Sequence, residues 1–277
     1  EMCIRDSYYW FSFVLETNFS LNQSSVKYFR QISVVIPIFN EAENISLLIK
    51  SIDEALLGLN YEIILVNDGS TDDTRTRLKE IYHSSLFIIE LEKNYGQSLA
   101  LEAGIDLAIG KYIVTMDGDL QNDPFDIPWM INKAELENWD LVTGIRNNRK
   151  DSFIKTIPSK IANYIISIIT KLDIKDHGCA LKVFTKETAK KINLQVQMHR
   201  YITLLAHFNG AKIVQVPVRH NQRQFGSSNY GLERVIRVTF DLLKLVYFQY
   251  LFQKNKKPLW IKEKKYSYKI KEISLQN

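Results

Sequence analysis

The chain has 277 residues, of which 45% are hydrophobic and 24% are charged, and this composition excludes collagen-like and disordered proteins. The net charge is +5, but Lys254–Asn277 alone contains eight lysines and two glutamates, a local +6, so the remainder carries −1. A near-neutral body with one basic segment argues against nucleic-acid binding. Two cysteines, Cys3 and Cys179, exclude a disulfide framework and a four-cysteine zinc site.

Residues 1–30 are expected to be a poorly ordered or non-native leader. They do not match a signal peptide, because Glu16 interrupts their apolar run and no small-residue cleavage site follows. From Ile32 onward, short β-branched runs alternate with helical patterns, which is typical of βαβ units and a mostly parallel sheet. The predicted strands are Ile32–Ile36, Tyr61–Val66, Leu86–Leu91, Tyr112–Met116 and Leu141–Thr143. The predicted helices between them are Glu43–Leu57, Asp72–Tyr82, Gln97–Ile109 and Ile127–Asn138.

The second half is less regular. The predicted elements are a helix over Lys155–Lys171, a strand over Ala180–Phe184, a helix from Thr185, a strand over Lys212–Val218 and an amphipathic helix over Val235–Phe252. No segment reaches the roughly 18 consecutive apolar residues of a membrane-spanning helix. The last helix is instead expected either to pack on the core or to lie on a bilayer, with its aromatic rings at headgroup depth beside the lysines. The sequence thus predicts one domain over residues 31–230, followed by an interfacial helix and a basic tail over residues 231–277.

Acidic loops follow several predicted strands, and in a parallel sheet such loops gather at one edge. The loop NDGSTDD (67–73) allows two interpretations: Ser70 or Thr71 caps the next helix, or Asp68, at the strand end, contacts a base or ribose. Asp117 and Asp119 form the stronger signal, because two carboxylates one residue apart repel each other unless a cation or proton lies between them. Such a pair suits Mg²⁺, which takes carboxylate oxygens as ligands. The alternative is that the two aspartates lie in a surface turn, which Gly118 permits.

The sequence does not match two other motifs that bind cations or phosphates. An EF-hand loop starting at Asp117 needs Gly at position 122 and Glu at position 128, where Asn122 and Pro128 stand. A phosphate-cradling P-loop is approached only at Gly104–Lys111, with one residue too many and Tyr112 in place of Ser or Thr.

Together these segments resemble the family 2 glycosyltransferases, and most closely the polyprenyl-phosphate branch, which includes dolichol-phosphate mannose synthase and the bacterial undecaprenyl-phosphate sugar transferases. The carrying motifs are VVIPIFNEAEN (34–44), YEIILVNDGSTDD (61–73), KNYGQSLALEAG (93–104), MDGDLQNDP (116–124), VTGIRNNRKDS (142–152), DHGCALKVF (176–184) and VPVRHNQRQFGSSNY (216–230). The resemblance implies a GT-A fold: an α/β architecture with a mostly parallel, Rossmann-like sheet flanked by helices.

The resemblance also implies roles for individual residues. Pro37, Phe39, Glu41 and Asp68 match nucleoside-binding positions, and Asp117, Asp119 and Gln121 match a site for Mg²⁺ or Mn²⁺. Asp119 and Asp176 match positions implicated in catalysis. The expected phosphate-binding residues are Arg146, Lys155 and Arg223.

The implied activity is inverting transfer of a sugar from a nucleotide-diphosphate sugar to a polyprenyl phosphate. This activity implies that the protein works at a membrane surface, on the cytoplasmic face of the membrane, where its partners are the nucleotide sugar and the lipid phosphate. A homo-oligomer is compatible with it. Two alternatives stay open: a family 2 enzyme that acts on a saccharide hydroxyl, and a degenerate nucleotide-binding scaffold protein. The second depends on Asn229, which stands where the family has Lys and loses the charge. Lys155 and Lys182 replace arginines of related enzymes and keep the charge but lose the bidentate fork.

Overall fold

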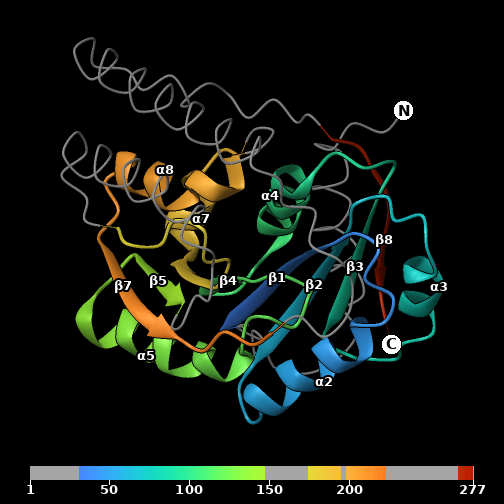
Figure 1. Ribbon diagram of the computed structural model, residues 1–277, viewed down its shortest axis with the longest axis horizontal. Helices are drawn as coiled ribbons and strands as arrows, with labels where there is room; N and C mark the ends of the chain where they lie inside the picture. Colours follow the sequence, from blue (N-terminus) through green and yellow to red (C-terminus); the bar gives the residue numbers. More distant parts are fainter. Residues whose placement is uncertain (1–30, 147–173, 195–197, 223–267, 277) are drawn as a thin grey trace, which may run out of the picture.

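The computed structural model describes residues 31–146, 174–194, 198–222 and 268–276. They form one eight-stranded sheet with helices on both faces (Figure 1). The strands are β1 (Ile32–Ile38), β2 (Tyr61–Asn67), β3 (Leu86–Leu91), β4 (Tyr112–Thr115), β5 (Leu141–Arg146), β6 (Lys182–Thr185), β7 (Ile213–Val218) and β8 (Ile270–Leu275). The helices are α2 (Ile45–Ala55), α3 (Thr74–Lys79), α4 (Gln97–Leu107), α5 (Ile127–Glu137), α7 (Lys186–Lys191) and α8 (Ile202–Phe208), with short 3₁₀ turns η1 (Pro124–Asp126) and η2 (Met198–Tyr201).

The strand order is β7-β5-β6-β4-β1-β2-β3-β8, and the prediction of a mostly parallel sheet is confirmed. Strands β3, β2, β1 and β4 are parallel neighbours, as are β5 and β7. Strand β6 runs antiparallel to both β4 and β5, and β8 runs antiparallel to β3. Every strand except β6 and β8 therefore ends at the same edge, and the residues that lead into β6 lie at that edge too.

Two apolar layers hold the sheet between the helices. One layer packs α2, α3 and α5 on one face through residues such as Leu48, Leu78 and Met130. The other packs α4, α7 and α8 on the opposite face through Leu99, Ala189 and Leu205 (Figure 1). All seven residues of β1 are buried, as expected for a central parallel strand that is covered on both faces.

The predicted elements up to β5 match the structure closely, and their ends have local causes. Helix α5 ends at Asn138, whose left-handed backbone (φ 57°) is tolerated by asparagine at such positions. Pro37 sits inside β1 without cost, because β4 pairs only as far as Val35↔Thr115 and no strand lies opposite the missing N–H. Helix α7 begins after Thr185, whose side chain accepts a hydrogen bond from Thr188 N.

The sequence analysis predicted no strand at β8 and placed these residues in a basic tail. The structure pairs them with β3, and Tyr268, only 3% exposed, packs into the α4 layer with its hydroxyl 3.2 Å from Asp106 Oδ2. Arg75 offsets the facing carboxylates of Glu90 and Glu272, at 3.8 and 3.4 Å. The strand was missed because Lys271 and Glu272 break the apolar alternation that marks strands. The predicted helices over 155–171 and 235–252 lie outside the described residues.

Candidate active site at the carboxyl edge of the sheet

The loops after β1 and β2 are joined side by side. Asn40, at a left-handed φ of 56°, donates from its backbone N to Ser70 Oγ (2.9 Å) and accepts from Thr71 N at its side-chain oxygen (2.8 Å). Ser70 and Thr71 therefore connect two loops and do not cap α3. That task falls to Asp72, whose Oδ1 accepts from Thr74 N at 3.0 Å.

Asp68 lies at the end of β2 and connects it to the start of α4. Its two carboxylate oxygens accept from Tyr95 N at 2.7 Å and Gly96 N at 2.8 Å, and the residue is 3% exposed. Burial raises the pKa of this carboxyl, and the two amide hydrogen bonds oppose the rise. The contact needs the adjacent Gly69, at φ +67°, because a Cβ there would lie 2.5 Å from the backbone of Lys93.

Asp117 and Asp119 follow β4 at the same edge. Gln97 Nε2, at the first residue of α4, donates to Asp117 Oδ1 at 2.7 Å. Since the preceding Gly96 is bound to Asp68, the stretch Tyr95–Gln97 spans directly between the two acidic positions. Sequence reasoning assigned no role to Gln97; its place in the KNYGQ motif directly after a strand was the available signal.

The negative charge of Asp117, next to Asp119, is electrostatically unfavourable in the described structure. Burial, and then the charge of Asp119, raise the pKa of Asp117 to about 6, whereas Lys182, Arg146 and Gln97 oppose the rise. Asp119 is 4% exposed, and its Oδ1 accepts from Gln121 N at 3.1 Å. Two close carboxylates of this kind fit a hard divalent cation. Among the described residues no group of three or more His, Cys, Asp or Glu side chains is placed to hold a metal ion, so this pair would bind it with other oxygens.

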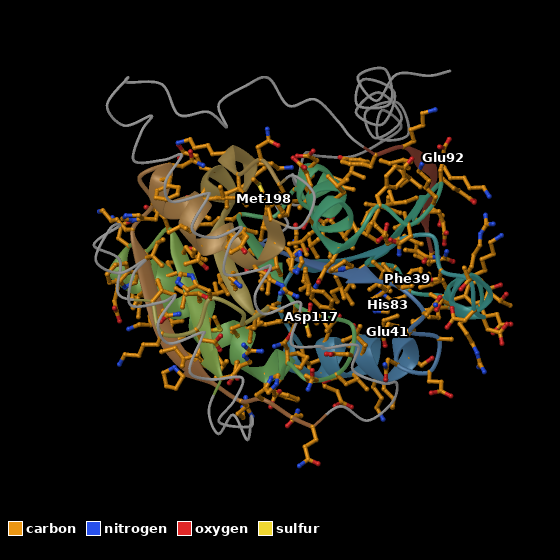
Figure 2. The ribbon with its side chains drawn as sticks, turned by 45° about the horizontal axis from the view of Figure 1, so that its top comes forward. Phe39, Glu41, His83, Glu92, Asp117 and Met198 are labelled. Atoms are coloured by element: carbon orange, nitrogen blue, oxygen red, sulfur yellow. The ribbon has the colours of Figure 1, made fainter. Side chains whose placement is uncertain are left out.

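Three of the four expected nucleoside residues, Pro37, Phe39 and Glu41, lie on β1 or just after it. Figure 2 shows Phe39 and Glu41. Pro37 is buried within the strand, whereas Phe39 is 42% exposed, which leaves its ring open for stacking. Glu41 N donates to Thr74 Oγ1 at 2.9 Å, and its side chain accepts from Asn44. Direct contact of these three residues with a nucleoside stays a prediction.

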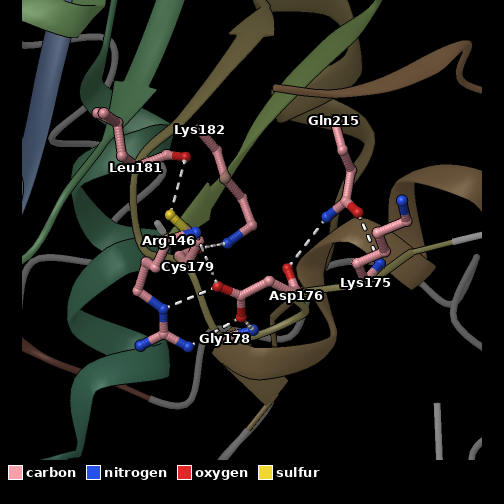
Figure 3. A network of polar contacts seen from close by, with 8 residues as sticks. All are labelled: Arg146, Lys175, Asp176, Gly178, Cys179, Leu181, Lys182 and Gln215. Atoms are coloured by element: carbon pink, nitrogen blue, oxygen red, sulfur yellow. Dashed lines mark hydrogen bonds and ion pairs between the residues drawn. The ribbon is translucent and has the colours of Figure 1, made fainter. Parts of the chain in front are cut away.

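Arg146, at the end of β5, is held by Asp176 in a two-pronged ion pair. Arg146 Nε and Nη2 donate to the two carboxylate oxygens at 2.8 Å each (Figure 3). The same carboxylate also accepts from the backbone N of Arg146 (3.2 Å) and of Gly178 (3.0 Å). Gly178 makes room for this pair, because a Cβ at that position would lie 2.8 Å from Arg146 Nη2. Asp176 thus positions a guanidinium at the edge where Asp117 also lies.

The neighbouring His177 is neutral. Within the described part of the chain, its two ring nitrogens are buried and have no hydrogen-bond partner. Burial, followed by the charge of Lys182, lowers the pKa of His177 to about 4. Its sequence position between Asp176 and Gly178 gave no sign of this environment.

The segment after β7 reaches the same acidic loop. Arg219 pairs with Asp123 at 3.1 Å and Asp126 at 3.0 Å, and Asn221 N donates to Gln121 O at 2.9 Å. These contacts, which the sequence analysis did not predict, fix the entry to the segment that contains Arg223. Arg223 and Lys155 themselves lie outside the described residues.

A sequence profile described as glycosyl transferase family 2 matches residues 33–194, which contain most of this edge. The chain belongs to glycosyl transferase family 2. A relative, the dodecaprenyl-phosphate galacturonate synthase of Rhizobium johnstonii, is 41% identical over 226 residues, covering 79% of this chain and 67% of the relative. The undecaprenyl-phosphate 4-deoxy-4-formamido-L-arabinose transferase of Klebsiella pneumoniae is 36% identical over 219 residues, covering 77% and 67%. The predicted resemblance to the polyprenyl-phosphate branch of family 2 is confirmed.

The solved structures that this family 2 chain resembles agree on the fold. Glucosyl-3-phosphoglycerate synthase from Mycobacterium tuberculosis, crystallised with Mn²⁺, uridine diphosphate and glucosyl-3-phosphoglycerate, superposes with a TM-score of 0.61. The identity is 21%, with 83% of this chain and 81% of that chain covered. The predicted GT-A type α/β fold is confirmed. Across the described residues, no helix has the length and apolar character needed to cross a bilayer.

Proposed function

We propose that this family 2 glycosyltransferase moves a sugar from a nucleotide-diphosphate sugar to a polyprenyl phosphate, with inversion at the anomeric carbon. The names of the two relatives support this acceptor class. The observation that carries the choice of acceptor is the Arg146–Asp176 pair, in which the carboxylate accepts four hydrogen bonds.

That pair favours a phosphate over a saccharide hydroxyl. A hydroxyl acceptor needs a general base to remove its proton, and a carboxylate engaged by a guanidinium is a poor base. A phosphate monoester has its second pKa near ~6, so it is mostly a dianion at neutral pH and attacks without losing a proton. Arg146, fixed by Asp176, is suited to hold such an anion in place.

The donor half is built from the loops after β1, β2 and β4. Phe39 is exposed for stacking on a base, and Asp68 and Glu41 lie beside it on joined loops. Asp117 and Asp119, with Gln121, would hold Mg²⁺ or Mn²⁺, which neutralises the charge that develops on a departing nucleoside diphosphate. In the transfer, an acceptor phosphate oxygen forms the new bond to the anomeric carbon while the bond from that carbon to the diphosphate oxygen breaks.

Transfer assays with labelled sugar nucleotides test the acceptor. Undecaprenyl phosphate and soluble saccharides are offered in parallel, each with Mg²⁺ or Mn²⁺, and we expect product only on the lipid phosphate. Product on saccharides alone would establish the hydroxyl-acceptor alternative. Absence of both transfer and sugar-nucleotide hydrolysis would favour a scaffold protein.

Two substitutions test the roles of the carboxylates. Asp119→Asn is expected to lower kcat by more than ~100-fold, because it removes half of the acidic pair. Asp176→Asn is expected to raise the KM for lipid phosphate by roughly 10-fold, because it loosens Arg146 without removing it. An equal loss in kcat for both variants would contradict the positioning role of Asp176. Asp72→Asn is the matched control, since Asn keeps the oxygen that accepts from Thr74 N.

We further propose that the enzyme acts at the cytoplasmic face of a membrane. Its acceptor class is lipid-linked, and the eight lysines of Lys254–Asn277 are a composition that anionic headgroups attract.

A further inference from the structure

Lys182 is a buried cation to which neither the sequence motifs nor the transfer chemistry has assigned a task. It is the first residue of β6 and is 3% exposed. Within the described residues its ammonium forms no ion pair with a carboxylate; its partner is the neutral backbone carbonyl of Cys179 (Figure 3). A buried ammonium with only a carbonyl partner is costly, because one neutral oxygen does not replace its hydration.

The neighbours of Lys182 place it among the reacting groups. Lys182 stands opposite Thr115 on β4 and Thr143 on β5, so these three side chains form a row on one face at the edge of the sheet. Burial lowers the pKa of Lys182, while the charges of Asp176 and Asp117 oppose the fall, which puts the ammonium within electrostatic reach of both halves of the site.

The row contains a second unsatisfied group. Thr115 Oγ1 donates to Ala180 O at 2.9 Å, but the fully buried Thr143 hydroxyl has no hydrogen-bond partner among the described residues. A buried ammonium and a buried hydroxyl, side by side and both lacking an anionic acceptor, are the donors that a phosphate oxygen accepts from. Arg146 Nε and Nη2 already donate to Asp176, so Lys182 and Thr143 add donors that Arg146 alone does not supply.

We propose that Lys182, assisted by the Thr143 hydroxyl, binds a phosphate group of a substrate during sugar transfer. The inference rests on the proposed function and adds a phosphate-binding residue to it. The phosphate belongs either to the donor diphosphate, which would lie next to Asp117, or to the lipid acceptor, which would lie next to Arg146. The two sources share one chemistry, and the experiment separates them.

Three variants of the full chain are compared with the wild type. Lys182→Met keeps the volume and removes the charge, Lys182→Arg keeps the charge, and Thr143→Val removes only the hydroxyl. Lys186→Met is the matched control, because Lys186 also donates to a backbone carbonyl, Ile109 O at 3.1 Å, but lies at the far end of β6. Calorimetry measures binding of UDP, UMP, GDP and GMP with Mg²⁺, and kinetics give the KM for undecaprenyl phosphate.

A donor role predicts that Lys182→Met weakens nucleoside diphosphate binding roughly 10- to 100-fold and monophosphate binding much less. An acceptor role predicts unchanged nucleotide binding and a KM for undecaprenyl phosphate raised by the same factor. In either case Lys182→Arg restores most of the lost affinity or KM, and Thr143→Val shows a smaller change of the same kind. The melting temperature of Lys182→Met is expected to be no lower than that of the wild type.

Unchanged nucleotide affinity together with an unchanged KM in Lys182→Met would overturn the inference. So would a loss that Lys182→Arg fails to restore while melting as the wild type does, because the charge would then not be the cause. If Lys182→Met does not fold, Lys182→Arg and Thr143→Val decide between the same outcomes. A wild-type chain that binds no nucleoside diphosphate would instead remove the proposed function itself.

Discussion

Asp117 is the residue whose environment is most at odds with its charge. Its pKa of about 6 lies above the value near 4 that it has in an unfolded chain, so between these values the folded state binds the extra proton. Without a bound cation, the contribution of Asp117 to folding stability is therefore fully present below about pH 4 and is lost as the pH rises through about 6.

Asp117→Asn tests this at the residue scale. The variant removes an ionised group that destabilises the metal-free fold by up to about 3 kcal/mol at pH 7. We expect a higher melting temperature than the wild type in EDTA at pH 7, equal melting temperatures near pH 4, and transfer lowered by more than ~100-fold. Thermal melts of both proteins across pH 4–8 check the sign of the difference in melting temperature. A lower melting temperature at pH 7 would mean that the carboxylate already has a compensating partner.

Most site residues were predictable because strand ends identify them. Asp117 follows an apolar run directly and Asp68 follows one after Asn67, and parallel pairing then brings both to one edge. The Arg146–Asp176 pair was not predictable as a contact, because 30 residues separate its members and β6 runs against its neighbours. The Ser70 and Thr71 hydroxyls were ambiguous for another reason: a local cap and a contact with Asn40 have the same sequence pattern.

At the scale of elements, β8 is the strand that local sequence failed to predict. Its pairing is held by Tyr268, which is buried against α4, rather than by an apolar face, because Lys271 and Glu272 are exposed. The fold up to β5 was predictable from apolar runs, whereas β8 depends on a contact between distant parts of the chain.

Tyr268 is therefore expected to control the docking of β8. Tyr268→Ala should lower the free energy of unfolding by about 3 kcal/mol or more, through the cavity it leaves, and Tyr268→Phe by about 1 kcal/mol through the lost hydroxyl. Urea denaturation measures both. Tyr82→Ala, at an 82% exposed tyrosine, is the surface control and should change little. Equal effects at Tyr268 and Tyr82 would mean that β8 is not docked in solution.

At the scale of the whole molecule, the charge is divided between a body of −1 and a C-terminal segment of +6. We expect the full chain to co-sediment with vesicles that contain anionic lipid, and to be released as salt screens the attraction. Replacing Lys254, Lys256 and Lys257 by Gln should weaken partitioning roughly 100-fold, at about 1 kcal/mol per lysine.

The control for this experiment replaces three exposed lysines of the body. They are Lys50, Lys79 and Lys186. Vesicle binding that falls equally in both triple variants would show that net charge, and not the C-terminal segment, drives association. Binding that persists unchanged in 0.5 M salt would point to insertion of apolar side chains.

The single reversed strand in the middle of the sheet has a further consequence. Because β6 starts at the edge where its neighbours end, the stretch that leads into it brings Asp176 and Lys182 there from a part of the chain separate from the loops after β1, β2 and β4. Under the proposed function, Asp176, which positions Arg146 for the acceptor, therefore lies on a different segment of the chain from Asp68 and Asp117, which are proposed to serve the donor. We expect that grafting residues 174–181, without Lys182, from a relative with another acceptor changes the acceptor preference and leaves nucleotide affinity unchanged.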